Sequence, residues 1–129
     1  MDSIFTKIIN KEIPAYIIDE NEDFISILDI NPIKKGHVLV IPKIQIDYFF
    51  DIDNDLLSKI MPYCKKISSA IKNAIECKRI GISVIGLEVP HAHVHLIPIN
   101  SISDMNFNNT KPLSKEEMVS IQNKIKSFL

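Results

Sequence analysis

The sequence predicts an α+β fold in which a mainly antiparallel five-stranded sheet packs against one long helix. Short apolar segments bounded by turn residues occur first as a group of three and later as a pair, and such short connections favour antiparallel neighbours. Between the two groups, apolar residues recur every three or four positions, which is typical of an amphipathic helix. Short helices are expected at both ends of the 129-residue chain, and this length suits a single domain over residues 1–129.

The N-terminal helix is predicted from a capping residue followed by an apolar stripe. Asp2 or Ser3 can serve as the N-cap, and Pro14 follows the stripe. The stripe has helical spacing and consists of Ile4, Phe5, Ile8 and Ile9.

The five strands are predicted from apolar runs that end at polar or Gly/Pro turns. The first two flank the polar turn 20–23, the third follows Gly36, and the last two flank Gly86. Their predicted ranges are 16–19, 24–29, 37–41, 81–85 and 92–97.

Residues 53–76 carry the helical period that predicts the long helix, and residues 101–110 are polar and predict a mobile loop. Ser114 and Glu117 have the spacing of a capping box, so a C-terminal helix is expected within 111–129.

Composition excludes several classes of protein. A net charge of −1 provides no basic field for nucleic acid. No apolar run reaches the roughly 18 residues of a membrane span, and we expect no signal peptide at the N-terminus. Cys64 and Cys77 fall on the predicted long helix about 20 Å apart, too far for a disulfide, so we expect reduced thiols and a cytoplasmic location.

Three of the four histidines fall within five residues. His91, His93 and His95 alternate with apolar residues, so a strand would place all three rings on one face. Mutual repulsion would keep the rings neutral near pH 7, and neutral imidazole is a good nucleophile and ligand. Such an array suits a metal ion or an anion that undergoes group transfer.

A metal site is the main alternative from the residues alone. Zinc is often held by three histidines, but rings at alternate strand positions spread over roughly 13 Å, too far for all three to reach one ion. A metal would need two of them and further ligands such as His37.

Residues 91–97, with the sequence His-Ala-His-Val-His-Leu-Ile, resemble the His-x-His-x-His-x-x signature of the histidine-triad (HIT) nucleotide-binding superfamily. Further blocks resemble this family in the same order along the chain, and residues 111–129 carry no such signal. These blocks are residues 4–15, 28–32, 36–43 and 86–91.

The resemblance implies an enzyme that acts at the α-phosphorus of purine nucleotide derivatives without a metal or other cofactor. Expected substrates are phosphoramidates, dinucleoside polyphosphates or adenylated conjugates. His93 would be the nucleophile that forms a covalent nucleotidyl-histidine, and hydrolysis would then release a nucleoside monophosphate. A backbone carbonyl near His91 would hold the proton of His93, while His95 and His37 would line the phosphate site.

The resemblance also implies binding residues and a homodimer. Asp29 would accept hydrogen bonds from the ribose hydroxyls, although it can equally be a turn residue before Asn31-Pro32. Glu88 would lie near the phosphate. A base slot is expected from four apolar residues that could equally be core: Phe5, Ile8, Ile27 and Leu28. The dimer would form through the long helix and a sheet edge.

The chain departs from the family at two places. Many members carry two cysteines and a histidine that bind structural zinc, whereas this chain has Ser3, Thr6 and Gln45 there, so no zinc is expected. The family's phosphate loop has no counterpart, because residues 81–86 are shorter than usual and Leu87 replaces a glutamine. A binding module with little turnover is therefore one alternative to the enzyme, and a metal-binding protein is the other.

Overall fold

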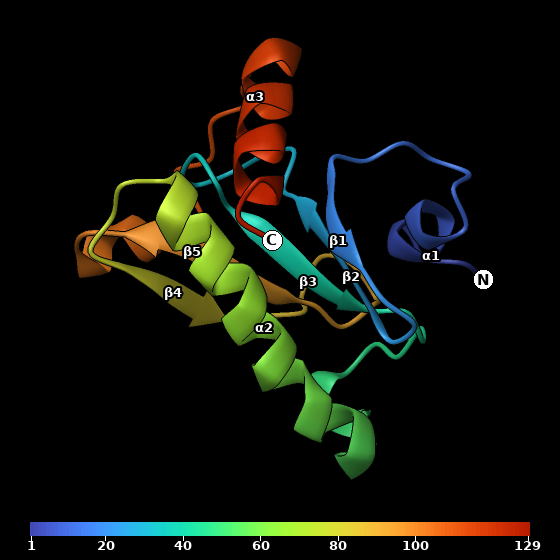
Figure 1. The fold of residues 1–129 in the computed structure, drawn as a ribbon. Coiled ribbons are helices and arrows are strands. Elements are labelled where there is room, and N and C mark those ends of the chain that lie inside the picture. The colour runs from blue at the N-terminus through green and yellow to red at the C-terminus, as the bar shows by residue number, and fades with distance from the viewer.

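The computed structural model describes residues 1–129 and has the predicted α+β architecture (Figure 1). Its five antiparallel strands lie in the order β1-β2-β3-β5-β4. The strands are β1 (Ile17–Glu20), β2 (Phe24–Leu28), β3 (Val38–Pro42), β4 (Arg79–Ser83) and β5 (Val94–Ile99). The helices are α1 (Ile4–Ile9), α2 (Asn54–Ala74) and α3 (Lys115–Lys126), with short 3₁₀ turns η1 (Phe49–Asp51) and η2 (Ile102–Met105).

Three polar side chains start the three α-helices. Ser3 accepts a hydrogen bond from the Thr6 N–H, Asp53 from that of Leu56, and Ser114 from that of Glu117. Each satisfies a backbone donor that the first helical turn leaves free. The Ser114 half of the predicted capping box is therefore confirmed. The carboxylate of Glu117, the other residue of that box, forms an ion pair with Lys35.

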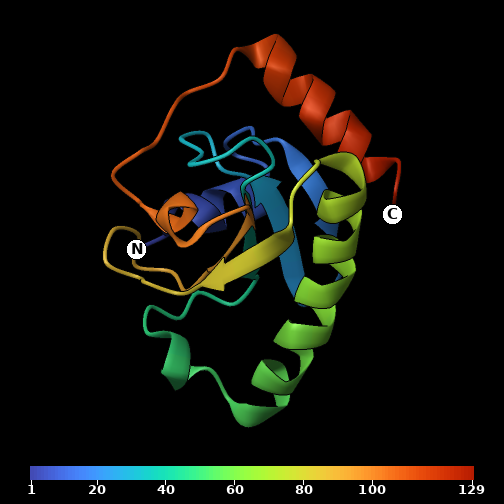
Figure 2. The same cartoon turned by 90° about the vertical axis from the view of Figure 1, so that its left-hand side faces the viewer.

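The sheet separates two apolar layers. Figure 2 shows α2 and α3 on one side of the sheet and α1 on the other. The larger cluster of 18 buried residues fills the α2 side, and a cluster of six lies under α1. Successive strand residues alternate between the two, as in β3, where Val38 and Val40 face α2 and Leu39 and Ile41 face α1.

The last strand begins later than predicted. β5 starts at Val94 rather than at residue 92, so His91 and His93 lie in the segment that leads into it. It also continues through Pro98, which can occupy the strand because β3 pairs with β5 only up to Leu96. β4 is likewise shifted to Arg79–Ser83. The segment predicted as a mobile loop contains η2.

Gly36 shapes the turn before β3. Its φ of +90° lies in the left-handed region, and a Cβ there would lie 2.8 Å from Cγ1 of Ile75 in the segment after α2. Only glycine avoids both the strain and the clash. The turn delivers His37 directly to the start of β3.

Cys64 is buried in α2, Cys77 follows the end of that helix, and both thiols are free. None of the helices combines the length and the apolar character needed to cross a membrane.

Candidate active site

All four histidines meet on the α1 side of the sheet. His95 in β5 lies opposite Leu39 in β3, and His37 immediately precedes β3. The ring centroid of His95 lies 4.9 Å from that of His93 and 5.2 Å from that of His37. All four side chains are buried. Ala92, Val94 and Leu96 belong to the cluster on the opposite face, so the predicted alternation is present although the strand starts late.

A backbone carbonyl orients His93. Its Nδ1 lies 2.8 Å from the carbonyl oxygen of His91, which is the type of contact that the family resemblance implies. Because a carbonyl oxygen only accepts, Nδ1 carries the hydrogen, and in the neutral ring the lone pair is at Nε2. The Phe5 ring packs edge-to-face with the ring of His93, and the two centroids are 5.0 Å apart.

Backbone geometry also fixes the hydrogens of His37 and His95. The Ile33 N–H donates to Nδ1 of His37 over 3.1 Å, so Nε2 of His37 carries the hydrogen. That Nε2 lies 3.0 Å from Nδ1 of His95 and donates to it. His95 therefore carries its own hydrogen at Nε2, and the site combines a lone pair on His93 with an N–H donor on His95.

Burial keeps these rings neutral. Burial, together with the smaller effect of neighbouring histidines, lowers the pKa of His37 to about 3 and that of His95 to about 4. Burial also lowers the pKa of His91. A neutral ring is required for each hydrogen-bond assignment above.

These depressed pKa values predict that acid destabilises the protein. Between about pH 6.5 and pH 4 the unfolded chain binds protons at His37 and His95 that the folded chain does not bind. The free energy of unfolding should therefore fall as the pH falls, by up to about 1.4 kcal/mol per pH unit for each histidine. Urea unfolding at pH 7, 6, 5 and 4 measures this.

His37→Gln is the control for that measurement, because it removes one of the rings whose pKa is lowered. Its unfolding free energy should depend less steeply on pH than that of the wild type. A wild-type free energy that stays constant from pH 7 to pH 4.5 would contradict the assignment of neutral buried rings.

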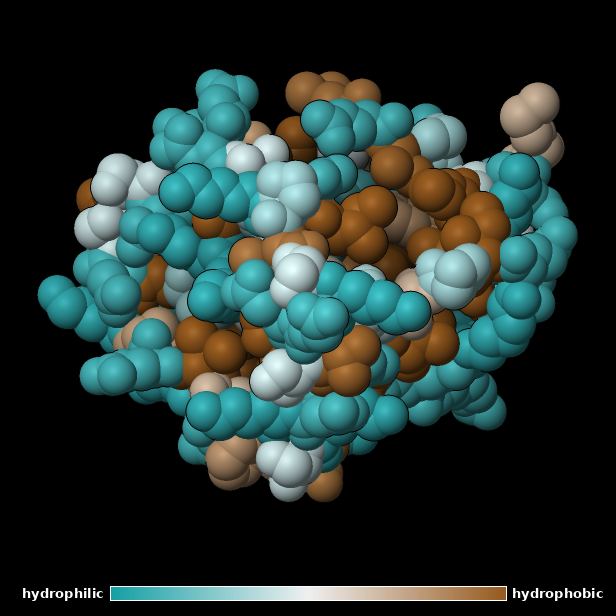
Figure 3. Space-filling view, turned by 90° about the horizontal axis from the view of Figure 1, so that it is seen from above, coloured by the Kyte–Doolittle hydropathy of each residue, from teal (hydrophilic) through white to brown (hydrophobic).

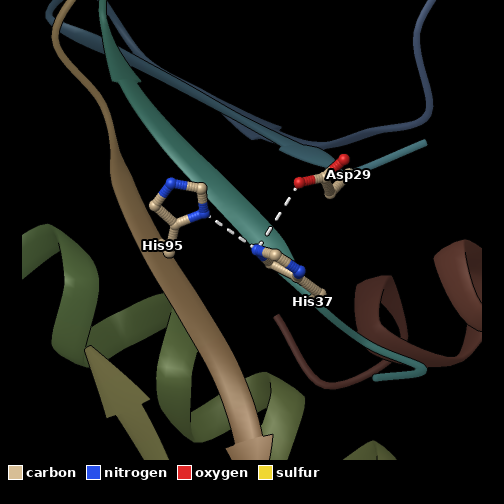
Figure 4. A group of neighbouring side chains, drawn as sticks. All are labelled: Asp29, His37 and His95. Atoms are coloured by element: carbon tan, nitrogen blue, oxygen red, sulfur yellow. Dashed lines mark hydrogen bonds and ion pairs between the residues drawn. The ribbon is translucent and has the colours of Figure 1, made fainter. Parts of the chain in front are cut away.

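Asp29 lies beside His37 and His95 (Figure 4). Its Oδ2 is 3.6 Å from Nε2 of His37, too far for a hydrogen bond, and its Oδ1 accepts the Asn31 N–H over 2.9 Å. One oxygen of Asp29 thus stabilises the turn before Asn31-Pro32, as the sequence predicts for a turn residue. Its second oxygen faces the histidines. Burial raises its pKa, and the Asn31 N–H and His93 oppose this effect.

Potential ligand atoms of Asp29, His37 and His95 all lie within 4.8 Å of one another, so this group is the candidate for a metal ion. The hydrogen bonds disfavour it. A metal at Nε2 of His37 would displace the hydrogen to Nδ1, where it would meet the Ile33 N–H. The donor set fits a hydrogen-bonded relay better than a metal centre.

Three of the four residues predicted for the base slot lie together. Phe5, Ile8 and Ile27 belong to the six-residue cluster under α1. Leu28 does not join them, because it follows Ile27 in β2 and packs in the larger cluster on the opposite face. The prediction for Leu28 is wrong for that reason. Hydrophobic residues also gather at the surface on the α1 side, bordered by hydrophilic ones (Figure 3).

Glu88 is exposed in the connection between β4 and β5, and its charge contributes to the raised pKa of Asp29. One neighbour of the site was not predicted. Phe107, in the segment after η2, lies edge-on to His95 at 4.8 Å and to His37 at 6.4 Å. It is the single aromatic residue in residues 101–110, which the sequence predicts as a polar loop. An isolated aromatic side chain in such a loop is the sequence feature that could have indicated a buried contact.

A model of the HIT domain matches residues 10–102. The chain belongs to the HIT family. It is 40% identical over 104 residues to an uncharacterized HIT-like protein of Borreliella burgdorferi, covering 75% of each chain. It is 36% identical over 96 residues to adenosine 5'-monophosphoramidase HNT1 of Saccharomyces cerevisiae, covering 74% of this chain and 61% of the yeast protein.

Its fold is similar to the crystal structure of a Hit-like protein from Bartonella henselae, with a TM-score of 0.86 and 30% identity. The match covers 99% of this HIT protein and 96% of the Bartonella chain.

The positions at which the family resemblance implies zinc ligands lie together but do not fit zinc. Ser3 Oγ is 2.7 Å from Nδ1 of His91, and Thr6 Oγ1 is 2.6 Å from Oε1 of Gln45. Ligands around a tetrahedral zinc ion are separated by roughly 3.3 Å or more, given metal–ligand bonds of about 2.0–2.3 Å. Neutral hydroxyl and amide groups at hydrogen-bond distance are also poor zinc ligands compared with thiolates.

Proposed function

We propose that this HIT protein is a metal-independent hydrolase or nucleotidyl transferase that acts at the α-phosphorus of purine nucleotide derivatives. The observation that carries the proposal is the fixed pattern of imidazole hydrogens. His93 has its Nδ1 hydrogen committed to the His91 carbonyl, and His95 receives a hydrogen bond from His37 at Nδ1. The first ring is thereby prepared to attack and the second to donate.

In the first step, the Nε2 lone pair of His93 forms a bond to the α-phosphorus, and the bond from phosphorus to the leaving group breaks. The leaving group departs with the electron pair of that bond and with a proton from solvent. The leaving group or a phosphoryl oxygen accepts a hydrogen bond from His95 Nε2–H. The nucleotidyl-imidazole then carries positive charge, which the His91 carbonyl at Nδ1 stabilises. In the second step water attacks the same phosphorus and gives a proton to solvent, and the bond from phosphorus to His93 Nε2 breaks. This releases the nucleoside monophosphate and restores neutral His93.

Asp29, Phe5, Ile8 and Ile27 support a nucleoside as the substrate. The free oxygen of Asp29 faces the histidine group and is suited to accept a ribose hydroxyl hydrogen. The apolar residues under α1 provide a surface on which a purine can pack, and Phe5 extends this surface to the ring of His93.

Adenosine 5'-phosphoramidate is the substrate that tests this function, because the related yeast protein is named as an adenosine 5'-monophosphoramidase. We expect the purified protein to release AMP with and without EDTA. Absence of AMP release at substrate concentrations that saturate binding would contradict the proposed activity. Loss of activity with EDTA would contradict its metal independence.

A binding module with little turnover is the second candidate, and the connection before His91 favours it. Residues 84–90 carry a single polar side chain, Glu88, and its negative charge repels a phosphate. AMP binding in calorimetry without release of AMP from the phosphoramidate would favour this candidate over the enzyme.

We also propose that the protein forms a homodimer through β4. This strand ends the sheet and has an unpaired edge. Ile82, Val84, Ile85 and Leu87, in and just after it, are all exposed. An exposed apolar edge strand favours pairing with another strand.

Ile82→Lys is expected to convert the dimer to a monomer, because it places a charge at the proposed interface. Light scattering at micromolar concentration measures the mass, with Ile102→Lys in η2 as the exposed control. A wild type with the mass of one chain would contradict the dimer.

A further inference from the structure

A group of four polar side chains joins the start of α1 to the segment that leads into β5. We define the Ser3 network as Ser3, Thr6, Gln45 and His91. Gln45 Oε1 accepts hydrogen bonds from the Ser3 N–H over 2.8 Å and from the Thr6 hydroxyl over 2.6 Å. Its side-chain amide donates to the Met1 carbonyl over 2.8 Å. The residue after Gln45 is also tied to this segment, since the Ile46 carbonyl accepts the Ala92 N–H over 2.7 Å.

The direction of each hydrogen bond in the Ser3 network follows from the backbone. His91 Nε2 lies 2.7 Å from the Pro42 carbonyl oxygen, which can only accept, so Nε2 carries the hydrogen. Nδ1 of the neutral His91 ring is then an acceptor. Ser3 Oγ, 2.7 Å away, donates to it while accepting the Thr6 N–H over 3.0 Å. One hydroxyl thus both caps α1 and holds His91.

We propose that the Ser3 network positions His93 by fixing His91, and that it takes the structural place at which the family resemblance implies zinc ligands. His91 is held at Nε2 by Pro42 and at Nδ1 by Ser3, and its side chain has no exposed surface. A ring clamped at both nitrogens restrains the backbone that carries it. The carbonyl of that same residue accepts the Nδ1 hydrogen of His93.

Ser3 is therefore a positioning residue, since it acts on His93 through His91. The catalytic part of this inference rests on the proposed function, whereas the hydrogen-bond assignments do not. Loss of the Ser3 donor leaves the buried Nδ1 of His91 with only the Thr6 hydroxyl in range, 3.5 Å away and already donating to Gln45. That ring and the segment around it must then rearrange. Alignment of the His93 lone pair should then be lost more than nucleotide affinity.

Three substitutions at Ser3 separate helix capping from the hold on His91. Ser3→Thr keeps both functions, and Ser3→Asp keeps the cap but has no hydrogen to donate. Ser3→Ala loses both. Ser114→Ala is the matched control, since Ser114 also caps a helix through its hydroxyl but lies at α3.

The decisive readout is the ¹⁵N NMR spectrum of the histidine rings, assigned with single histidine substitutions. In the wild type, Ser3→Thr and Ser114→Ala, we expect His91 to carry its hydrogen at Nε2 and His93 at Nδ1. In Ser3→Asp, His91 should carry hydrogens on both nitrogens. In Ser3→Ala, the His91 Nδ1 signal should shift and the His93 Nδ1–H should exchange faster with water.

Turnover provides the second readout where the wild type is active. Ser3→Ala should lower kcat between about 3- and 10-fold, the loss expected from one hydrogen bond, with the Kd for AMP unchanged. Unaltered His91 and His93 signals in a folded Ser3→Ala protein would overturn the positioning role, whatever the activity. An inactive wild type with the expected spectra would refute the proposed function but not the Ser3 network.

Stoichiometric zinc in protein purified without chelators, with the metal lost in Ser3→Ala, would overturn the hydrogen-bonded network itself. We expect elemental analysis to find no zinc bound at this site, because the donor atoms lie within hydrogen-bond distance of one another.

Discussion

His93→Ala is expected to lower AMP release from adenosine 5'-phosphoramidate by at least about 10³-fold, the scale seen when a catalytic nucleophile is removed. The substitution removes the ring whose Nδ1 is committed to the His91 carbonyl and whose Nε2 is the proposed attacking atom. Because no other histidine donates a hydrogen bond to this carbonyl, none can replace His93 in the same geometry. A steady-state assay of AMP release measures the effect.

AMP affinity is the control for this prediction. His93→Ala should still bind AMP, since Asp29 and the apolar residues under α1 are untouched. Lys72→Ala, an exposed change on α2, should have wild-type turnover. Residual activity above a tenth of wild type in His93→Ala would contradict covalent catalysis by this ring.

Ile71→Ala is expected to lower the free energy of unfolding by about 3 kcal/mol. Ile71 lies in α2 with no exposed surface, in the cluster that packs against the sheet. Loss of its side-chain methyl and methylene groups removes buried apolar surface and leaves a cavity, for which costs of about 2–5 kcal/mol are typical. Urea unfolding measures the difference.

The adjacent Lys72 provides the control on the same helical turn. Lys72→Ala removes an exposed side chain and should change the unfolding free energy by less than about 0.5 kcal/mol. Equal effects of the two substitutions would contradict the orientation of α2 on the sheet.

The architecture was predictable because it depends on local periodicity. The 3.6-residue period of α2 and the apolar runs of the strands are both explicit in the sequence, and the five-stranded sheet with its long helix is confirmed. The start of β5 was less predictable. The alternation of His91 and His93 continues into the strand, but ladder hydrogen bonds to β3 begin only at Val94.

The composition of the site was predictable only where a residue's chemistry is distinctive. The three clustered histidines were found from their spacing and His37 from the family resemblance. Phe107 was missed because its approach to His95 depends on the path of the chain after η2. Adjacent strand residues cannot share a face, so Ile27 and Leu28 could not both line the base slot. Because β2 is buried on both sides, its sequence does not indicate which of the two faces the site. The role of Ser3 depends on the tautomer of His91, which only tertiary contacts determine.

Covalent nucleotidylation of His93 can be tested directly. The most direct measurement mixes the protein with adenosine 5'-phosphoramidate, quenches the reaction in alkali on the millisecond scale, and maps the modified peptide by mass spectrometry. We expect one acid-labile adenylyl group per chain, on His93, which disappears as AMP forms. AMP release without any enzyme-bound adenylyl group, or an adenylyl group on His95 or His37, would contradict this expectation.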